Sequence, residues 1–184
     1  MKKRCLALAA CALALVLTAC GAKTAQVRPA PLTASEQSLV DLVFAGGKTK
    51  LFDIALPAEA QWMDVTQWTL VDGAWQGETA MGGVVGGRLC LRVDEGGMLV
   101  YASVGSATAR VETGPGAALP EGHICTETWL TEPAALALDT ETPLYLYIES
   151  ADGTVEVFAP SAYETPEKLA GYIRVTAVTV RPTV

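Results

Sequence analysis

The sequence contains one histidine, His123, and this scarcity excludes several kinds of site. A zinc site needs several histidine or cysteine ligands, and no Cys-x-x-Cys pair is present to supply them. A serine hydrolase would need His123 as its base, and the chain has no Gly-x-Ser-x-Gly motif. The glycine-rich stretch at 82–87 lacks the Lys-Ser/Thr ending of a phosphate loop. The sequence therefore predicts no metal, no other cofactor and no catalytic residues.

Long apolar runs and basic residues are also scarce. One run, from about Leu6 to Leu17, covers about a dozen residues, whereas a membrane-spanning helix needs about 20. Removing residues 1–19 takes away three of the 13 basic residues and no acidic one, which leaves ten basic against 20 acidic residues and a net charge of −10. Such a surface repels nucleic acid, so we expect no nucleic-acid partner.

The first twenty residues have the layout of a secretory signal, because Lys2, Lys3 and Arg4 precede the apolar run and small residues follow it. Leu17, Thr18, Ala19 and Cys20 resemble the lipobox of bacterial lipoproteins. The resemblance implies cleavage before Cys20, acylation of its thiol, and a location on the extracytoplasmic face of the cell membrane. Two acyl chains would hold the protein durably. A plain secretory signal, cut nearby, is the alternative.

The domain organisation follows from this assignment. We expect a signal peptide at 1–19, a lipidated tether at 20–32 and a single domain at 33–184. Residues 21–32 combine small, polar and proline residues without an apolar period, as linkers do. The 165 residues that remain after removal of the first 19 of 184 suffice for one domain with a hydrophobic core.

One helix is predicted at the start of this domain. Thr33 precedes Glu36 by three residues, which is the spacing of a capping box. Apolar residues at Leu39, Leu42 and Val43 then recur on one helical face. Because the glycine pair 46–47 can end a helix, we expect it to cover 34–45.

Beyond residue 50 the apolar residues alternate with polar ones, which is typical of strands. Asp72-Gly73 predicts a type I′ hairpin turn, and Leu89, Leu91 and Val93 should share the core face of a second hairpin. Two stretches without a sustained period, 76–87 and 113–123, are expected to be loops. Strands are expected at 50–56, before Val71, in the second hairpin within 87–104, at 108–112, at 124–130, in a third hairpin within 143–158 and at 171–180. Eight or nine short strands and one N-terminal helix predict an antiparallel β-sandwich or a jelly roll.

The hairpin predicted at 143–158 contains the main candidate binding site. If Asp152 and Gly153 form its turn, one face carries the apolar residues Leu144, Leu146, Ile148, Val155 and Val157 and faces the core. The opposite face then carries Tyr145, Tyr147, Phe158, Glu149 and Glu156. Aromatic rings beside acids could bind a sugar, a cationic ligand or Ca²⁺. Alternatively, the helix or a loop covers the rings and Arg174 or Arg181 neutralises the acids.

Other candidate residues each have a structural alternative. Cys90 and Cys125 could form a disulfide, since export permits oxidation, or could be two buried thiols. His123 and Cys125 would share a face in an extended segment and could form a nucleophilic pair, although a loop histidine beside a buried cysteine is the simpler interpretation. Four tryptophans could stack on carbohydrate or fill the core.

These observations favour a non-catalytic binding or scaffolding domain on a lipoprotein. Its expected partners are the membrane, through lipid on Cys20, and an envelope glycan or protein. A carbohydrate-binding module and an envelope hydrolase are the alternatives. The order of helix, glycine pair, "LFDIALP" strand and "LVDGAW" turn over residues 35–76 also resembles small Gram-positive lipoproteins of uncharacterised function. That resemblance implies no functional residues.

Overall fold

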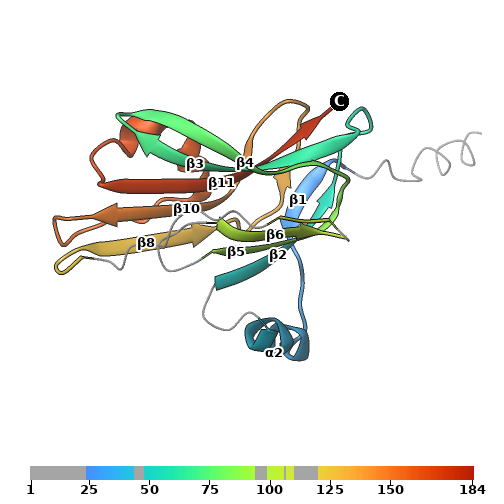
Figure 1. Ribbon diagram of the computed structural model, residues 1–184, viewed down its shortest axis with the longest axis horizontal. Coiled ribbons are helices and arrows are strands. Elements are labelled where there is room, and N and C mark those ends of the chain that lie inside the picture. Colours follow the sequence, from blue (N-terminus) through green and yellow to red (C-terminus); the bar gives the residue numbers. More distant parts are fainter. Residues whose placement is uncertain (1–23, 44–47, 94–98, 106, 110–119) are drawn as a thin grey trace, which may run out of the picture.

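The computed structural model describes residues 24–43, 48–93, 99–105, 107–109 and 120–184, and most of them lie in two antiparallel sheets (Figure 1). The strands are β1 (Gln26–Pro29), β2 (Lys48–Ala55), β3 (Trp62–Val71), β4 (Ala74–Val84), β5 (Gly87–Val93), β6 (Leu99–Val104), β7 (Ala107–Ala109), β8 (Ile124–Trp129), β9 (Ala134–Ala135), β10 (Thr142–Ser150) and β11 (Arg174–Thr183). The helices are α2 (Ala34–Val43) and the 3₁₀ turns η1 (Pro160–Glu164) and η2 (Pro166–Lys168). The predicted mainly-β sandwich is confirmed, with more strands than expected.

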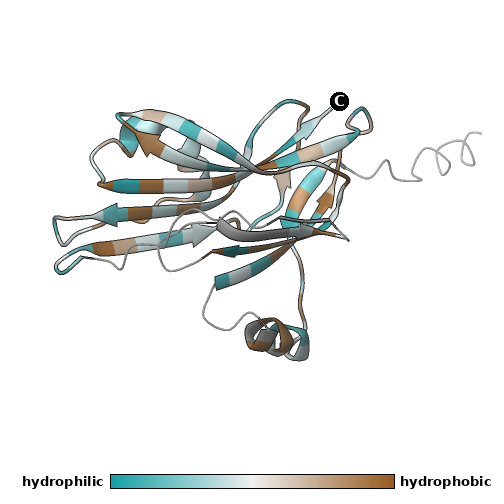
Figure 2. Cartoon of the chain, in the orientation of Figure 1, coloured by the Kyte–Doolittle hydropathy of each residue, from teal (hydrophilic) through white to brown (hydrophobic). Residues whose placement is uncertain are grey.

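Hydrophobic and hydrophilic residues alternate along many of the strands (Figure 2). One sheet has the order β7-β6-β5-β2-β1-β9 and the other the order β4-β3-β11-β10-β8. The predicted type I′ turn is confirmed between β3 and β4, because Asp72 and Gly73 both have positive φ, at 51° and 77°. Local turn chemistry therefore sets this hairpin.

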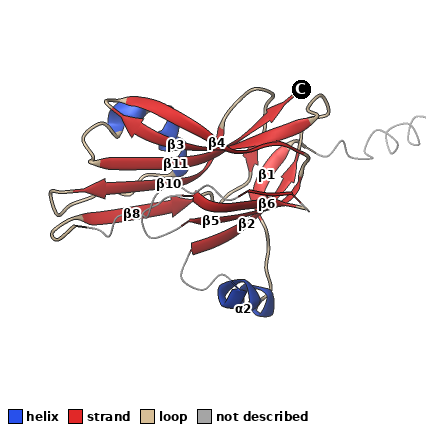
Figure 3. Ribbon diagram, in the orientation of Figure 1, coloured by secondary structure: helices blue, strands red, loops and turns tan. Residues whose placement is uncertain are grey.

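The predicted helix is present as α2, below the two sheets in Figure 3. Its capping box is formed: the Thr33 amide donates to Glu36 Oε2 at 2.8 Å, and the Glu36 amide donates to Thr33 Oγ1 at 3.3 Å. The predicted end of this helix near residue 45 lies outside the described residues, as does most of the loop predicted at 113–123.

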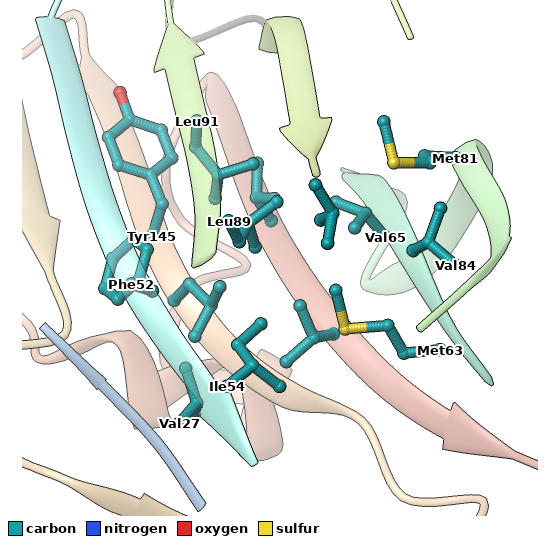
Figure 4. Packing of buried hydrophobic residues seen from close by; sticks show 14 of the residues in the cluster. Val27, Phe52, Ile54, Met63, Val65, Met81, Val84, Leu89, Leu91 and Tyr145 are labelled. Carbon is teal, nitrogen blue, oxygen red and sulfur yellow. The ribbon is translucent and has the colours of Figure 1, made fainter. Parts of the chain in front are cut away.

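The core lies between the two sheets (Figure 4). Leu89 and Leu91 of β5 and Phe52 of β2 meet Val65 of β3 and Tyr145 of β10 there. The three residues predicted to share the core face of β5 are buried, which confirms that prediction. Apolar burial between two sheets is the main source of stability in this architecture.

The glycine-rich stretch at 76–87 is not a loop as predicted, because most of it belongs to β4. β4 pairs with β3 along its length, and Gly77 lies opposite Trp68. A Cβ atom on Gly77 would come within 2.5 Å of the Trp68 indole ring. Glycine is therefore required at position 77, because the Trp68 ring lies against the backbone there. A glycine that is needed for packing in a strand cannot be told from a loop glycine by composition alone.

The prediction of a hairpin at 143–158 is wrong. β10 pairs with β8 and β11, and residues 154–158 form no strand. The segment between β10 and β11 instead packs Phe158, Tyr163 and Leu169 against the outer face of the five-stranded sheet, where they cover Leu146 and Ile148. This packing is favourable because it removes the apolar side chains of that sheet face from water.

The tether is shorter than predicted, because residues 26–29 form β1 inside the six-stranded sheet. β1 pairs with both β2 and β9. Val27 is fully buried in the core, and Arg28 lies 3.6 Å from Asp53 of β2. Residues 26–29, which the prediction places in the tether, therefore belong to the six-stranded sheet.

Candidate functional site

The predicted ligand face is divided between different parts of the fold. Tyr145 and Tyr147 are buried between the sheets, whereas Phe158 packs on the outer face, 6.1 Å from Tyr172 between ring centroids. Glu156 is exposed, and its amide donates to the Tyr172 hydroxyl. Because the hairpin is not formed, these residues do not share a surface. Tyr145, Tyr147 and Glu149 do follow one another on one face of β10, where the Tyr147 hydroxyl contacts Glu149.

Glu149 is the centre of a charged cluster at one end of the five-stranded sheet. It stands near the end of β10, opposite Cys125 of the neighbouring β8 and Arg174 of the neighbouring β11. A carboxylate near the end of an apolar strand is buried by its neighbours, and only 4 % of Glu149 is exposed. Such a charge requires partners.

Three side chains supply those partners. Arg174 Nη2 lies 2.5 Å from Glu149 Oε2, and His123 Nδ1 lies 2.9 Å from Oε1. The Tyr147 hydroxyl donates to Oε2 at 3.4 Å and accepts a hydrogen bond from Arg174 at 3.3 Å. The Arg174 guanidinium also lies 5.3 Å from the centre of the Tyr147 ring, within the range of a cation–π contact. The cluster is therefore cross-linked.

The electrostatics of the cluster keep its acid and its base charged. Burial raises the pKa of the Glu149 carboxyl, but hydrogen bonds from His123 and Arg174 outweigh it and lower this pKa below its ordinary value. Burial opposes the charge on Arg174, yet its bonds to Glu149 and Tyr147 raise the pKa of the guanidinium. Burial, with a contribution from Cys125 and against that of Arg174, raises the pKa of Tyr147 to about 12. Tyr147 therefore keeps its proton.

The charge on Glu149 also orients His123. An ionised carboxylate only accepts hydrogen bonds, so Nδ1 of His123 carries the proton. In the neutral imidazole Nε2 is then an acceptor, and it is the ring nitrogen left for a ligand. His123 is held just before β8, where its own amide donates to the Pro120 carbonyl at 3.0 Å.

His123, Glu149 and Arg174 line an open cleft of about 770 Å³. Its walls come from the turn between β3 and β4, the segment before β8 and the segment before β11, and the remaining lining residues are Thr69, Leu70, Val71, Asp72, Gly73, Pro120, Ala170, Tyr172 and Ile173. Ile173 is 54 % exposed and Asp72 is also exposed. The cleft thus has apolar walls, the Asp72 carboxylate and the His123 imidazole. Glu149 and Arg174 also line it, but their charges neutralise each other.

The disulfide that Cys90 and Cys125 could form is absent, and the alternative of two buried thiols is not met either, because Cys90 is partly buried and Cys125 is exposed. Leu89 and Leu91 face the core, so Cys90 between them points to the opposite side of the six-stranded sheet. Cys125 is exposed on the edge strand of the other sheet, beside Tyr147 and Glu149. The two thiols therefore belong to different surfaces. His123 makes its polar contact with Glu149, not with a thiolate.

Three of the four tryptophans are engaged in packing. Trp75 stacks on Tyr163 with 4.8 Å between ring centroids, and its indole donates to the Tyr163 carbonyl. The Trp68 indole donates to Thr179, and Trp129 lies 4.5 Å from Tyr145 between ring centroids. Trp62 is more exposed than these three. The described residues thus offer no coplanar set of exposed indoles for stacking on a sugar.

All members of the cluster are candidate residues in the sequence, but the structure pairs them differently. Arg174, one of the two arginines that could neutralise the acids, pairs with Glu149. Arg181 instead pairs with Asp64 at 3.1 Å. The contact between His123 and Glu149 was missed, because it spans 26 positions and depends on which strand lies beside β10. The one available signal was an acid at the end of an apolar strand.

The described residues hold no group of three or more histidine, cysteine, aspartate or glutamate side chains arranged for a metal ion. No family model matches the chain, and comparisons with curated proteins and with solved structures found no significant match. The geometry and the sequence are therefore the basis for a functional proposal.

Proposed function

We propose that the chain is a lipid-anchored protein of the cell envelope whose β-sandwich binds a peptide segment in the His123–Glu149–Arg174 cleft. The cleft carries this proposal, because it brings residues from four separate segments to one opening of about 770 Å³. The lipobox-like residues that end at Cys20 support the anchor. None of the helices among the described residues has the length and apolarity to cross a bilayer.

The chemistry of the lining favours a peptide. Nε2 of His123 and the Asp72 carboxylate can accept hydrogen bonds from N–H groups, while Leu70, Val71 and Ile173 offer apolar contact. Arg174 is already paired with Glu149, so it offers little to an anionic ligand. Since most of the tryptophans are packed, a glycan would find few rings to stack on.

A binding measurement tests the cleft. The probes are blocked hexapeptides that each contain one leucine and one lysine, compared with N-acetylglucosamine oligomers, in calorimetric titrations. Ile173→Ser and His123→Ala should weaken peptide binding by about tenfold or more. Val157→Ser is the matched control, because Val157 is 69 % exposed and lies outside the cleft lining. Equal loss in the control, or binding of the glycan oligomers alone, would contradict the proposal.

The anchor has a separate test. Cys20→Ala should shift the protein from the membrane fraction to the soluble fraction of cells, because no acyl chain can then be attached. An unchanged membrane fraction would contradict the lipid anchor and would leave the cleft proposal intact.

A further inference from the structure

α2 exposes apolar side chains that no described strand covers. Leu39 is 60 % exposed and Leu42 is 75 % exposed. The helix stands apart from both sheets in Figure 1, and Figure 2 shows hydrophobic residues on it. Because the two leucines are three positions apart, they lie on the same helical face. That face is available to a partner outside the sandwich.

The helix begins in a cap of its own rather than against the sheets. The Thr33 hydroxyl and amide both donate to Glu36 Oε2 at 2.8 Å, and the Gln37 amide donates to the Thr33 carbonyl at 2.9 Å. Yet a helix of ten residues is marginal in water without packing. Its capped start and its bare apolar face together indicate an element that is completed by contact with another surface.

The position of the lipid anchor indicates which surface this is. Only five residues separate Cys20 from Gln26, the first residue of β1, so Gln26 lies within about 20 Å of a lipidated Cys20. β1 is fixed in the sheet, and four residues after it lead to α2. Fourteen positions therefore join Cys20 to Ala34, the first residue of α2, so the anchor holds α2 within about 50 Å of the bilayer and at a high effective concentration.

Building on the lipid anchor of the proposed function, we propose that α2 lies in the interface of the same bilayer, with Leu39 and Leu42 inserted among the acyl chains. The helix contains Glu36 and Asp41 and no basic residue, so its contact is apolar rather than electrostatic. A short amphipathic helix next to a lipid anchor supplies the second attachment that fixes orientation. The bilayer contact would thereby set the direction in which the cleft faces.

Hydrogen exchange on vesicles tests this contact. The lipidated chain is reconstituted in phosphatidylcholine vesicles, and the amides of 34–43 are compared with those of the Cys20→Ala chain without vesicles. Exchange in the helix should be at least about tenfold slower on vesicles, which corresponds to about 1.4 kcal/mol. Leu39→Ser combined with Leu42→Ser should abolish the difference. Val184→Ser is the matched control, because Val184 is also 60 % exposed, and it should leave the difference unchanged.

The outcomes separate this proposal from its alternatives. Slow exchange that persists in high salt supports apolar insertion, since screening weakens only charge attraction. Equal exchange on and off vesicles in an anchored chain overturns the α2 contact and leaves the anchor standing. Protection of the Cys20→Ala chain that grows with protein concentration in the absence of vesicles overturns it in favour of a second copy. Loss of the anchor itself appears separately, as an unchanged membrane fraction of the Cys20→Ala chain.

Discussion

Glu149 and Asp53 each contact two basic side chains, but their surroundings differ. The side chain of Glu149 is 5 % exposed, and that of Asp53 is 26 % exposed. Asp53 lies on the six-stranded sheet, with Arg28 at 3.6 Å and Arg88 at 2.9 Å, and both arginines are about half exposed. Glu149 lies at the cleft and has shorter contacts. Each carboxylate thus has two basic neighbours, but in two different environments.

The comparison shows that burial, rather than the number of partners, decides how much an ion pair contributes to the free energy of unfolding. Water screens the Asp53 pairs, so removing one costs little. Glu149 has lost most of its hydration, and its energy depends on His123, Arg174 and Tyr147 remaining in place. A cluster of that kind holds its side chains in one arrangement, which is what a binding site needs.

Among the substitutions that test this comparison, removal of Arg174 should destabilise the protein most. Arg174→Ala leaves the buried Glu149 charge without its strongest partner, so we expect the free energy of unfolding to fall by about 3 kcal/mol. Urea denaturation at pH 7 measures the change. Arg174→Lys should recover part of the loss, because it restores the charge without the forked geometry. A loss below about 1 kcal/mol for the alanine variant would show that Glu149 behaves like the exposed Asp53.

Glu149→Gln should cause the second largest loss in the free energy of unfolding, and this loss should depend on pH. At pH 7 the variant should lose about 2 kcal/mol, because hydrogen bonds to a charged group are replaced by neutral ones. The pKa of Glu149 is lowered by folding, so its contribution is complete above the ordinary value of 4.5 and is lost as the pH falls through the lowered value. The difference between wild type and variant should therefore shrink below pH 4.5.

The control for this pH dependence is Glu36→Gln. The pKa of the exposed Glu36 is also lowered, by hydrogen bonds from Thr33. This variant should flatten the acid limb of the stability curve less than Glu149→Gln does, since the Glu36 charge stays in water. A constant difference between wild type and Glu149→Gln from pH 7 to pH 3 would contradict the role assigned to the Glu149 charge.

His123→Ala should have a smaller effect on stability than either change. It removes one hydrogen bond from a carboxylate that keeps Arg174 and Tyr147, so about 1 kcal/mol is expected. The measurement is again the urea midpoint at pH 7. If His123→Ala cost as much as Arg174→Ala, the imidazole and not the guanidinium would be the main partner of Glu149.

Asp53→Asn should have the smallest effect. Its two arginines are solvated and remain so, which limits the loss to about 0.5 kcal/mol. Thermal unfolding of wild type and variant at low and high salt checks the expectation, and the difference should vanish in high salt. A loss comparable with that of Glu149→Gln would remove the contrast between the two clusters.

Two Asp-Gly dipeptides show how far the sequence could predict this fold. Asp72-Gly73 forms the predicted hairpin turn, because both residues adopt positive φ and adjacent strands pair. At the second dipeptide only Gly153 has positive φ, at 66°, and no strand follows. Turn chemistry is equally suitable in both. The outcome differs because the residues after Gly153 bury apolar side chains over the sheet instead of pairing with β10.

Local signals therefore determined the class of the fold, the capped start of α2 and the core face of β5, since each depends on neighbours in the sequence. Only the tertiary structure decided the partners of Glu149. Strand order places Cys125 and Arg174 beside it and brings His123 within 2.9 Å, across separations that no periodicity records. The physical reason is that a buried carboxylate takes its partners from whichever strands flank it, and that order is set by the packing of the whole sandwich.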